Sequence, residues 1–91
     1  MNFKETLDAC DAAGILVYAA KIAYEVEFFF PDKGRNHPDF EQMCQLVSEA
    51  YIDIDYPIDV SKVVETLKEL LENGEELDNI NSSDIVDNID F

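Results

Sequence analysis

The C-terminal part of this chain concentrates negative charge that no base relieves. From Glu69 to Phe91 there are eight carboxylates and not one Lys, Arg or His. Like charges at this density repel one another, so any fold that contains them must hold them at its surface. The segment is therefore either a solvated tail or a surface whose negative charge has a function.

The rest of the chain is less extreme, and acidity increases along it. In total, 21 acids stand against 6 bases, a net charge of −15. Residues 1–36 carry −2, residues 37–68 carry −5 and the remainder carries −8. A field of this sign repels nucleic acid and anionic membranes and attracts basic protein surfaces. We therefore expect a basic protein partner and no direct contact with nucleic acid or a membrane.

Length and composition predict one globular domain over residues 1–91. Hydrophobic residues make up 47% of the chain, which is ordinary for a protein with a packed core. The most charge-balanced part, residues 1–36, is expected to be the scaffold or the dimer interface, and residues 53–91 are expected to present the acidic surface. These expectations place the charge and the core on different parts of one domain.

Targeting and redox signals favour the cytoplasm. The apolar run at 12–20 is shorter than the ~20 residues that span a bilayer, and acids precede it where a signal peptide needs positive charge. Cys10 and Cys44 lie far apart, each on an apolar helical face, as buried thiols often do. We predict a cytoplasmic protein without a disulfide framework.

Helical spacing of apolar residues predicts a mainly α fold with three principal helices and a short fourth. The first helix is expected to begin at Asn2 and to stop before Pro31, with a bend or a break at Gly14. The second is expected to begin at Pro38 and to end near Tyr51.

The third helix is expected to have Ser61 as its cap and Gly74 as its C-terminal stop. A short final helix from Ser83 carries Ile85, Val86, Ile89 and Phe91, and a purely solvated tail would not need these apolar residues. We therefore expect the C-terminal segment to dock on the domain.

Two short stretches are less regular. Ile and Asp alternate at 52–58, which predicts a short edge strand or an extended connector, because Pro57 cannot donate a ladder hydrogen bond. Phe28, Phe29 and Phe30 are consecutive on the first helix and must point in three directions. At least one ring should face away from the core, and a homodimer interface would bury it.

The sequence does not support an enzyme, and it predicts no cofactor and no metal site. His37 is the only histidine and stands in a loop beside Pro38, without a visible catalytic partner. Three isolated glycines cannot form a phosphate-binding loop. The Asp-rich stretch from Asp53 fails as a calcium loop, because Ile58 and Val64 occupy the positions that require Gly and Glu.

With no catalytic or metal-binding motif in the sequence, the feature that bears most on function is the arrangement of the carboxylates. Glu65, Glu69 and Glu72, followed by Glu76, recur at the spacing of one helix face, away from the Val and Leu stripe. The alternating segment is expected to supply a second row, and the C-terminal segment a third. The carboxylates predicted to form this partner-binding surface are Asp53, Asp55, Asp59, Glu65, Glu69, Glu72, Glu75, Glu76, Asp78, Asp84, Asp87 and Asp90.

Rows of fixed carboxylates can imitate DNA. Duplex DNA presents about one negative charge per ~1.7 Å of its axis, in two rows that flank a groove. A helix edge beside a parallel acidic row is a sparser version of this pattern, and it could occupy the DNA-binding cleft of a basic protein. The alternative is an ordinary solvated helix face and tail.

In size, charge and Asp/Glu layout the chain resembles the phage-encoded DNA-mimic anti-restriction proteins, most of all the small inhibitors of restriction nucleases. The resemblance covers the whole chain in character and includes no short diagnostic motif. It implies a compact, helix-rich dimer that blocks a host defence enzyme in the host cytoplasm, with a restriction nuclease of the modification-dependent McrBC kind as the target.

A second hypothesis assigns the charge to solubility alone. The protein would then be an adaptor or inhibitor that engages its partner through the apolar patch at Phe28–Phe30. Salt separates the two hypotheses, because binding through carboxylates weakens as salt rises and binding through an apolar patch hardly changes.

Overall fold

Four α-helices make up most of residues 16–54 and 58–89, which are the residues that the computed structural model describes, with side chains from residue 20 onward. They are α2 (Leu16–Phe29), α3 (Phe40–Asp53), α4 (Val60–Glu72) and α5 (Ser82–Asn88), and a 3-10 turn, η1 (Leu77–Asn79), precedes α5. No strand occurs among the described residues. The prediction of a mainly α fold is therefore confirmed.

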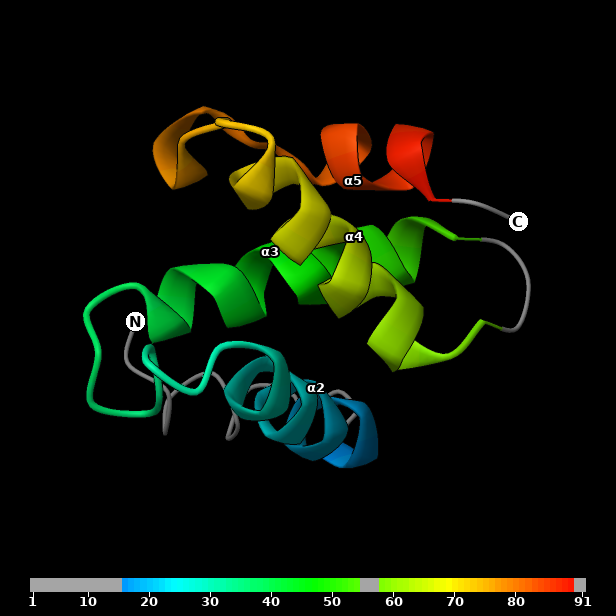
Figure 1. Cartoon of the computed structure of the whole chain (residues 1–91). Coiled ribbons are helices and arrows are strands. Elements are labelled where there is room, and N and C mark those ends of the chain that lie inside the picture. The colour runs from blue at the N-terminus through cyan, green and yellow to red at the C-terminus, as the bar shows by residue number, and fades with distance from the viewer. Residues whose placement is uncertain (1–15, 55–57, 90–91) are drawn as a thin grey trace.

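The helices pack around a central pair. In Figure 1, α3 and α4 cross in the middle of the molecule, α2 lies on one side of this pair and α5 on the other. Both central helices contact each other, α2 and α5. None of the described helices is long and apolar enough to cross a membrane.

The core consists of aliphatic and aromatic side chains from all four helices. Ile85 of α5 is completely buried, and Ile89, the residue after that helix, is 7% exposed. The prediction that the C-terminal segment docks is therefore confirmed. The largest completely buried side chains are Val26, Phe40, Met43, Val47, Val63, Val64, Leu67 and Ile85.

The described part of the first predicted helix is α2, which ends before Pro31 as expected. Its expected start at Asn2 and its expected bend at Gly14 lie outside the described residues. Of the three consecutive rings, Phe29 and Phe30 pack against the core and Phe28 is 68% exposed. The prediction that at least one ring faces away from the core is confirmed.

Helix α3 begins two residues later than predicted. The backbone N–H of Asp39 donates to Nδ1 of His37 at 3.0 Å, and the N–H of Phe40 donates to the His37 carbonyl at 3.1 Å. These bonds form a turn through Pro38, and the helix starts only at Phe40. His37 is thus a turn residue at a helix start, as its sequence position indicated.

The strand prediction for 52–58 is wrong at its first two residues. Helix α3 continues through Ile52 and Asp53, and only Ile54 turns to extended backbone, with φ −89° and ψ 121°. Tyr51 and Ile54, three residues apart, both pack against the core, whereas Ile52 is 65% exposed. Helical spacing therefore outweighs the alternation of Ile and Asp. Pro57 lies outside the described residues.

Helix α4 begins one residue before its predicted cap. Asp59, not Ser61, is the N-cap, and its side chain accepts a hydrogen bond from the Ser61 N–H at 3.1 Å. An aspartate satisfies an orphan donor of the first turn as well as a serine does.

Gly74 ends α4 as predicted. Its N–H donates to the Leu71 carbonyl at 3.2 Å, and the N–H of Glu75 donates to the Leu70 carbonyl at 3.1 Å. This pair of bonds, with a glycine at φ 98°, is the Schellman ending of a helix. The chain therefore leaves the helix axis immediately after Glu72.

A capping box starts α5. The Asp84 N–H donates to Oδ1 of Asn81, and the Asn81 N–H donates to a carboxylate oxygen of Asp84, both at 3.0 Å. The helix begins at Ser82, one residue before the predicted Ser83. The turn that brings α5 back onto the core is thus stabilised at its own start.

We predict that Gly74→Ala lowers the free energy of unfolding by about 1–2 kcal/mol, because a Cβ is strained at positive φ. An added Cβ would meet no atom within 4 Å, so backbone strain is the only source of the loss. Gly34→Ala is the matched control: it also meets nothing and is not at positive φ, so it should be neutral or slightly stabilising. Urea denaturation measures both, and equal losses would contradict the assignment.

Candidate acidic interaction surface

Three glutamates form an exposed ridge along α4. Glu65, Glu69 and Glu72 are all exposed, while Val63, Val64 and Leu67 of the same helix are completely buried. Their spacing places neighbouring carboxylates on one edge of the helix, ~5–6 Å apart at Cβ. We call Glu65, Glu69 and Glu72 the α4 ridge.

Glu76 does not extend this ridge, and that part of the prediction is wrong. Helix α4 ends at Glu72, and the chain turns at Gly74, so Glu76 precedes η1 instead of standing one turn further along. Glu75 and Glu76 are both exposed in the connection between the two elements.

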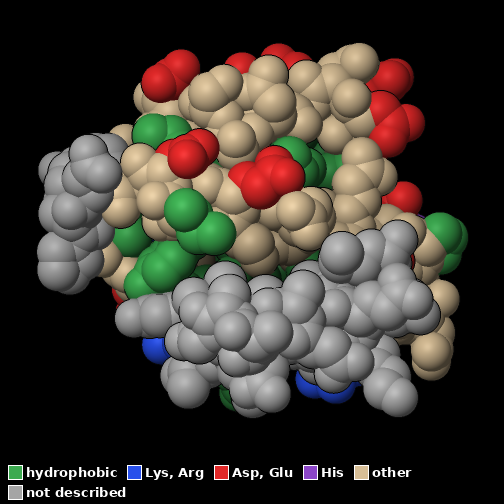
Figure 2. Space-filling view, turned by 180° about the vertical axis from the view of Figure 1, so that it is seen from behind, with side chains coloured by type: hydrophobic (Ala, Val, Ile, Leu, Met, Phe, Trp, Pro, Cys, Tyr) green, Lys and Arg blue, Asp and Glu red, His purple; other side chains and the backbone are tan. Residues whose placement is uncertain are grey.

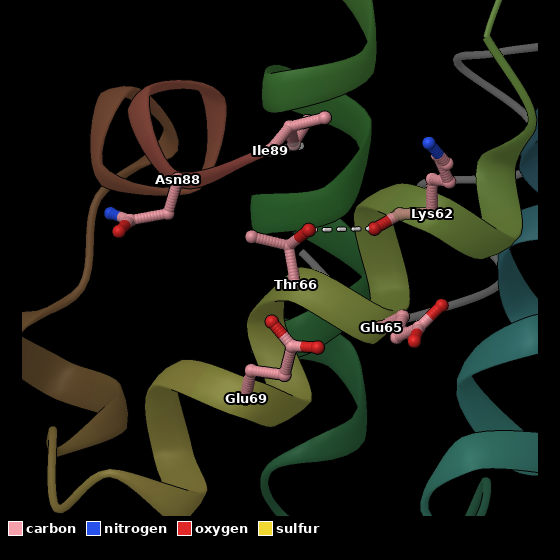
Figure 3. Close-up of a pocket in the computed structure, with 6 residues that line it drawn as sticks. All are labelled: Lys62, Glu65, Thr66, Glu69, Asn88 and Ile89. Atoms are coloured by element: carbon pink, nitrogen blue, oxygen red, sulfur yellow. Dashed lines mark hydrogen bonds between the residues drawn. The ribbon is translucent and has the colours of Figure 1, made fainter. Parts of the chain in front are cut away.

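A hollow of about 180 Å³ lies beside the ridge, between α4 and the end of α5. Figure 3 shows Glu65 and Glu69 on the α4 side and Asn88 with Ile89 on the α5 side. Between them lies Thr66, which is 6% exposed and donates its hydroxyl hydrogen to the Lys62 carbonyl at 2.8 Å. The ridge therefore borders a groove whose opposite wall belongs to another helix.

The predicted third row lies on η1 and α5. Asp78 and Asp87 are exposed and Asp84 is half-buried. Asp84 belongs to the capping box, and Asp78 accepts a hydrogen bond from Nε2 of Gln42 at 3.0 Å. Two of these three carboxylates thus also stabilise the fold. Asp90 lies outside the described residues.

The predicted second row is not a row on an extended segment. Asp53 is the exposed last residue of α3, and Asp59 is the exposed N-cap of α4. Asp55, between them, lies outside the described residues. Hydrogen bonds from Ser61, helped by Lys21 at 3.8 Å, lower the pKa of the Asp59 carboxyl. Asp59 is thus a structural cap whose charge is partly compensated.

Lysines lie close to the α4 ridge as well as elsewhere: Lys62 lines the same hollow as Glu65 and Glu69, and Lys68 belongs to the same helix. The ion pairs between described residues join Lys21 to Asp59, Lys33 to Asp39 and Arg35 to Glu27. Within the part of the chain that is described, none of the carboxylates from Glu65 to Asp87 has such a partner. On the face in Figure 2, Asp and Glu side chains lie over the upper part and the centre, whereas Lys and Arg lie at the lower edge.

Two described groups that often take part in catalysis, His37 and Cys44, lie outside the ridge. Nδ1 of His37 accepts the Asp39 N–H, and burial raises the pKa of the Cys44 thiol to about 12, with Glu27 adding to the shift. A thiol with such a pKa is not a nucleophile near neutral pH. Within the described residues, no group of three or more His, Cys, Asp or Glu side chains is placed to hold a metal ion.

An exposed aromatic pair occupies α2, away from the ridge in sequence. Tyr24 and Phe28 are 65% and 68% exposed and lie four residues apart, on one side of the helix. The Phe28 ring meets the Phe29 ring edge to face, with centroids 5.5 Å apart. Tyr24 was not singled out from the sequence, although its spacing from Phe28 was a usable signal.

Comparison of the chain with protein-family models, with curated proteins and with solved structures finds no match. What the protein does therefore has to be inferred from its own surface.

We predict that Asp59→Asn lowers stability near pH 5 and makes less difference as the pH falls. The pKa of Asp59 is lowered from 3.8 in the folded protein, so its ionised form stabilises the fold above pH 3.8. This contribution is lost as the pH falls through the lower, folded pKa. Asparagine can still accept the cap hydrogen bond but cannot titrate.

Urea denaturation of both proteins, from about pH 5 down to about pH 2, measures this difference. Convergence of the two stabilities at low pH is the expected result. A difference that stays constant over the whole range would show that the Asp59 charge does not contribute.

Proposed function

We propose that the protein is a DNA mimic that inhibits a DNA-binding protein. The α4 ridge and the carboxylates of the η1 and α5 region would occupy the DNA-binding site of a host restriction nuclease, or of another DNA-binding defence protein. The observation that carries the proposal is an exposed ridge of glutamates without ion pairs among the described residues, beside a hollow whose other wall is α5.

Rigid placement supports mimicry over a solvated tail. The buried side chains of Val63, Val64 and Leu67 anchor α4 to the core, and that of Ile85 anchors α5. A disordered acidic tail would spread its charge over many conformations, whereas DNA presents phosphates at fixed positions. Charges held by a packed core can meet fixed lysines and arginines with less loss of conformational entropy.

The proposed partner is a basic DNA-binding groove. Arg and Lys side chains that neutralise phosphates in such a groove would meet carboxylates instead, and bound counterions would be released from both surfaces. By the resemblance stated above, the target is a modification-dependent nuclease of the McrBC kind, met in the host cytoplasm.

A homodimer is part of the proposal. Phe28 and Tyr24 offer exposed apolar area on α2, and two copies joined there would carry twice −15, or −30. Neither Tyr24 nor Phe28 lines the hollow between the α4 ridge and α5, so the proposed interface does not include that hollow.

We predict that the protein displaces duplex DNA from its target nuclease and that displacement collapses as salt rises from roughly 50 to 300 mM. Glu65→Lys with Glu69→Lys should weaken this competition by at least about tenfold, because two repulsive contacts replace two attractive ones. Fluorescence anisotropy of labelled duplex on the nuclease measures it.

The matched control is Glu25→Lys with Glu49→Lys, on α2 and α3. Each reversal adds two positive charges, so both double variants carry −11 instead of −15. The control should compete almost as well as the unchanged protein. Equal weakening in the two variants would mean that total charge, not the ridge, is responsible, and competition indifferent to salt would contradict mimicry.

The exposure of Phe28 favours a second candidate function. In that case the protein binds its partner through the Tyr24 and Phe28 pair and carries charge for solubility. The two rings are the largest exposed apolar side chains on α2 among the described residues, and aromatic rings often dominate binding energy at interfaces.

Tyr24→Ser with Phe28→Ser separates the candidates. Both side chains are exposed, so stability should change by less than about 0.5 kcal/mol. If the rings form the dimer interface, sedimentation will show a shift to monomer while the ridge still competes with DNA. If the variant no longer binds the target, and binding of the unchanged protein does not depend on salt, the second candidate is correct.

A further inference from the structure

A second hollow, of about 410 Å³, lies on the other flank of the α4 ridge. Its walls come from the end of α2 and the loop after it, and from the last turns of α4. The apolar lining consists of Phe29, Phe30, Pro31 and Leu71, and the charged residues around it are Asp32, Lys33, Lys68 and Glu72. We call this hollow the α2–α4 groove.

The two lysines of the α2–α4 groove are engaged within the protein. Nζ of Lys33 lies 3.2 Å from Oδ2 of Asp39, and Nζ of Lys68 lies over the Phe29 ring, 5.9 Å from its centroid. The two carboxylates, Asp32 and Glu72, are exposed and form no ion pair with another described residue. Counting Asp39, which pairs with Lys33, three carboxylates and two ammonium groups surround the apolar lining, a net charge of −1.

We propose that the α2–α4 groove docks a basic amphipathic segment of a partner protein. An aliphatic or aromatic side chain of that segment would contact Phe29, Phe30 and Leu71, and flanking Lys or Arg side chains would meet Asp32 and Glu72. Aromatic rings suit such a segment, because they accept both aliphatic stems and cations, as Lys68 over Phe29 illustrates within the chain.

Charge and the proposed α2 interface argue against other occupants of this groove. A second copy of the chain is already assigned to Tyr24 and Phe28, which do not line the groove. The net charge of −15 repels nucleic acid and acidic peptides. A neutral apolar segment would gain nothing from Asp32 and Glu72, so a basic amphipathic segment is the occupant that uses both features of the groove.

This inference goes beyond the proposed function. Of the groove residues only Glu72 belongs to the carboxylates proposed to replace phosphates, and the groove opens on the flank of the ridge opposite α5. Binding here adds an apolar anchor that DNA does not offer, so it can exist whether or not the ridge imitates DNA.

The test uses the full chain and a synthetic amphipathic peptide of leucine and lysine, about 14 residues long, or four helical turns. Calorimetry near physiological ionic strength gives its Kd. Asp32→Lys with Glu72→Lys should weaken binding about tenfold. Glu75→Lys with Glu76→Lys, exposed beyond the end of α4 and equal in total charge, should weaken it by less than about threefold.

Three results would overturn the proposal. Equal losses in the two variants would show that total charge alone attracts the peptide. Equal binding of a peptide with glutamine in place of lysine would show that Asp32 and Glu72 play no part. A wild-type dimer that dissociates in the Asp32→Lys, Glu72→Lys variant would identify the groove as a contact between copies of this chain.

The failure of this inference and that of the proposed function are distinguishable. Glu65→Lys with Glu69→Lys should reduce DNA competition and leave the difference between the two groove-test variants in place. If DNA competition fails while the peptide still discriminates between those variants, only the mimic proposal is lost. If the peptide does not discriminate while DNA competition persists, only the groove proposal is lost.

Discussion

Repulsion between carboxylates, opposed by apolar burial on the same helices, is the balance on which this structure depends. Helix α4 carries Glu65, Glu69 and Glu72 on one edge and buries Val63, Val64 and Leu67 on another. Burying each aliphatic side chain contributes roughly 1.5–3 kcal/mol, whereas an exposed like-charge pair on a helix opposes folding by only a few tenths. Burial therefore prevails, and the charges remain as a fixed array instead of separating by unfolding.

Local hydrogen bonds determine where that array stops. The Schellman turn at Gly74 takes the chain off the axis of α4 and places Glu76 before η1, and the capping box at Asn81 returns the chain to the core. The acidic segment is thereby folded back against α3 and α4, with a hollow on each flank of the α4 ridge. A straight, longer helix would have presented one acidic line; this fold presents a ridge with two distinct flanks.

Sequence patterns predict the local structure correctly where a single interaction dominates, and incorrectly where two interactions compete. Apolar spacing predicted the helices and the docking of Ile85, and a glycine after an apolar stripe predicted the end of α4. Alternation at Ile52 and Asp53 pointed to a strand, but packing of Tyr51 and Ile54 at helical spacing decided otherwise. The sequence pattern placed Asp59 in a row of charges, whereas in the structure Asp59 is the N-cap of α4. The α2–α4 groove joins residues some forty positions apart in the sequence, so no local sequence pattern could predict it.

The measurement that most directly tests this account is the free energy of unfolding as a function of salt, for the unchanged protein and for Glu69→Gln, which removes the middle charge of the ridge and has no lysine three or four residues away. If fixed carboxylates repel one another in the folded state, the unchanged protein will gain stability as salt rises from roughly 20 to 300 mM. The variant will then be the more stable protein at low salt, and the difference will shrink as salt is added. A flat salt dependence, with the variant no more stable at low salt, would contradict the account.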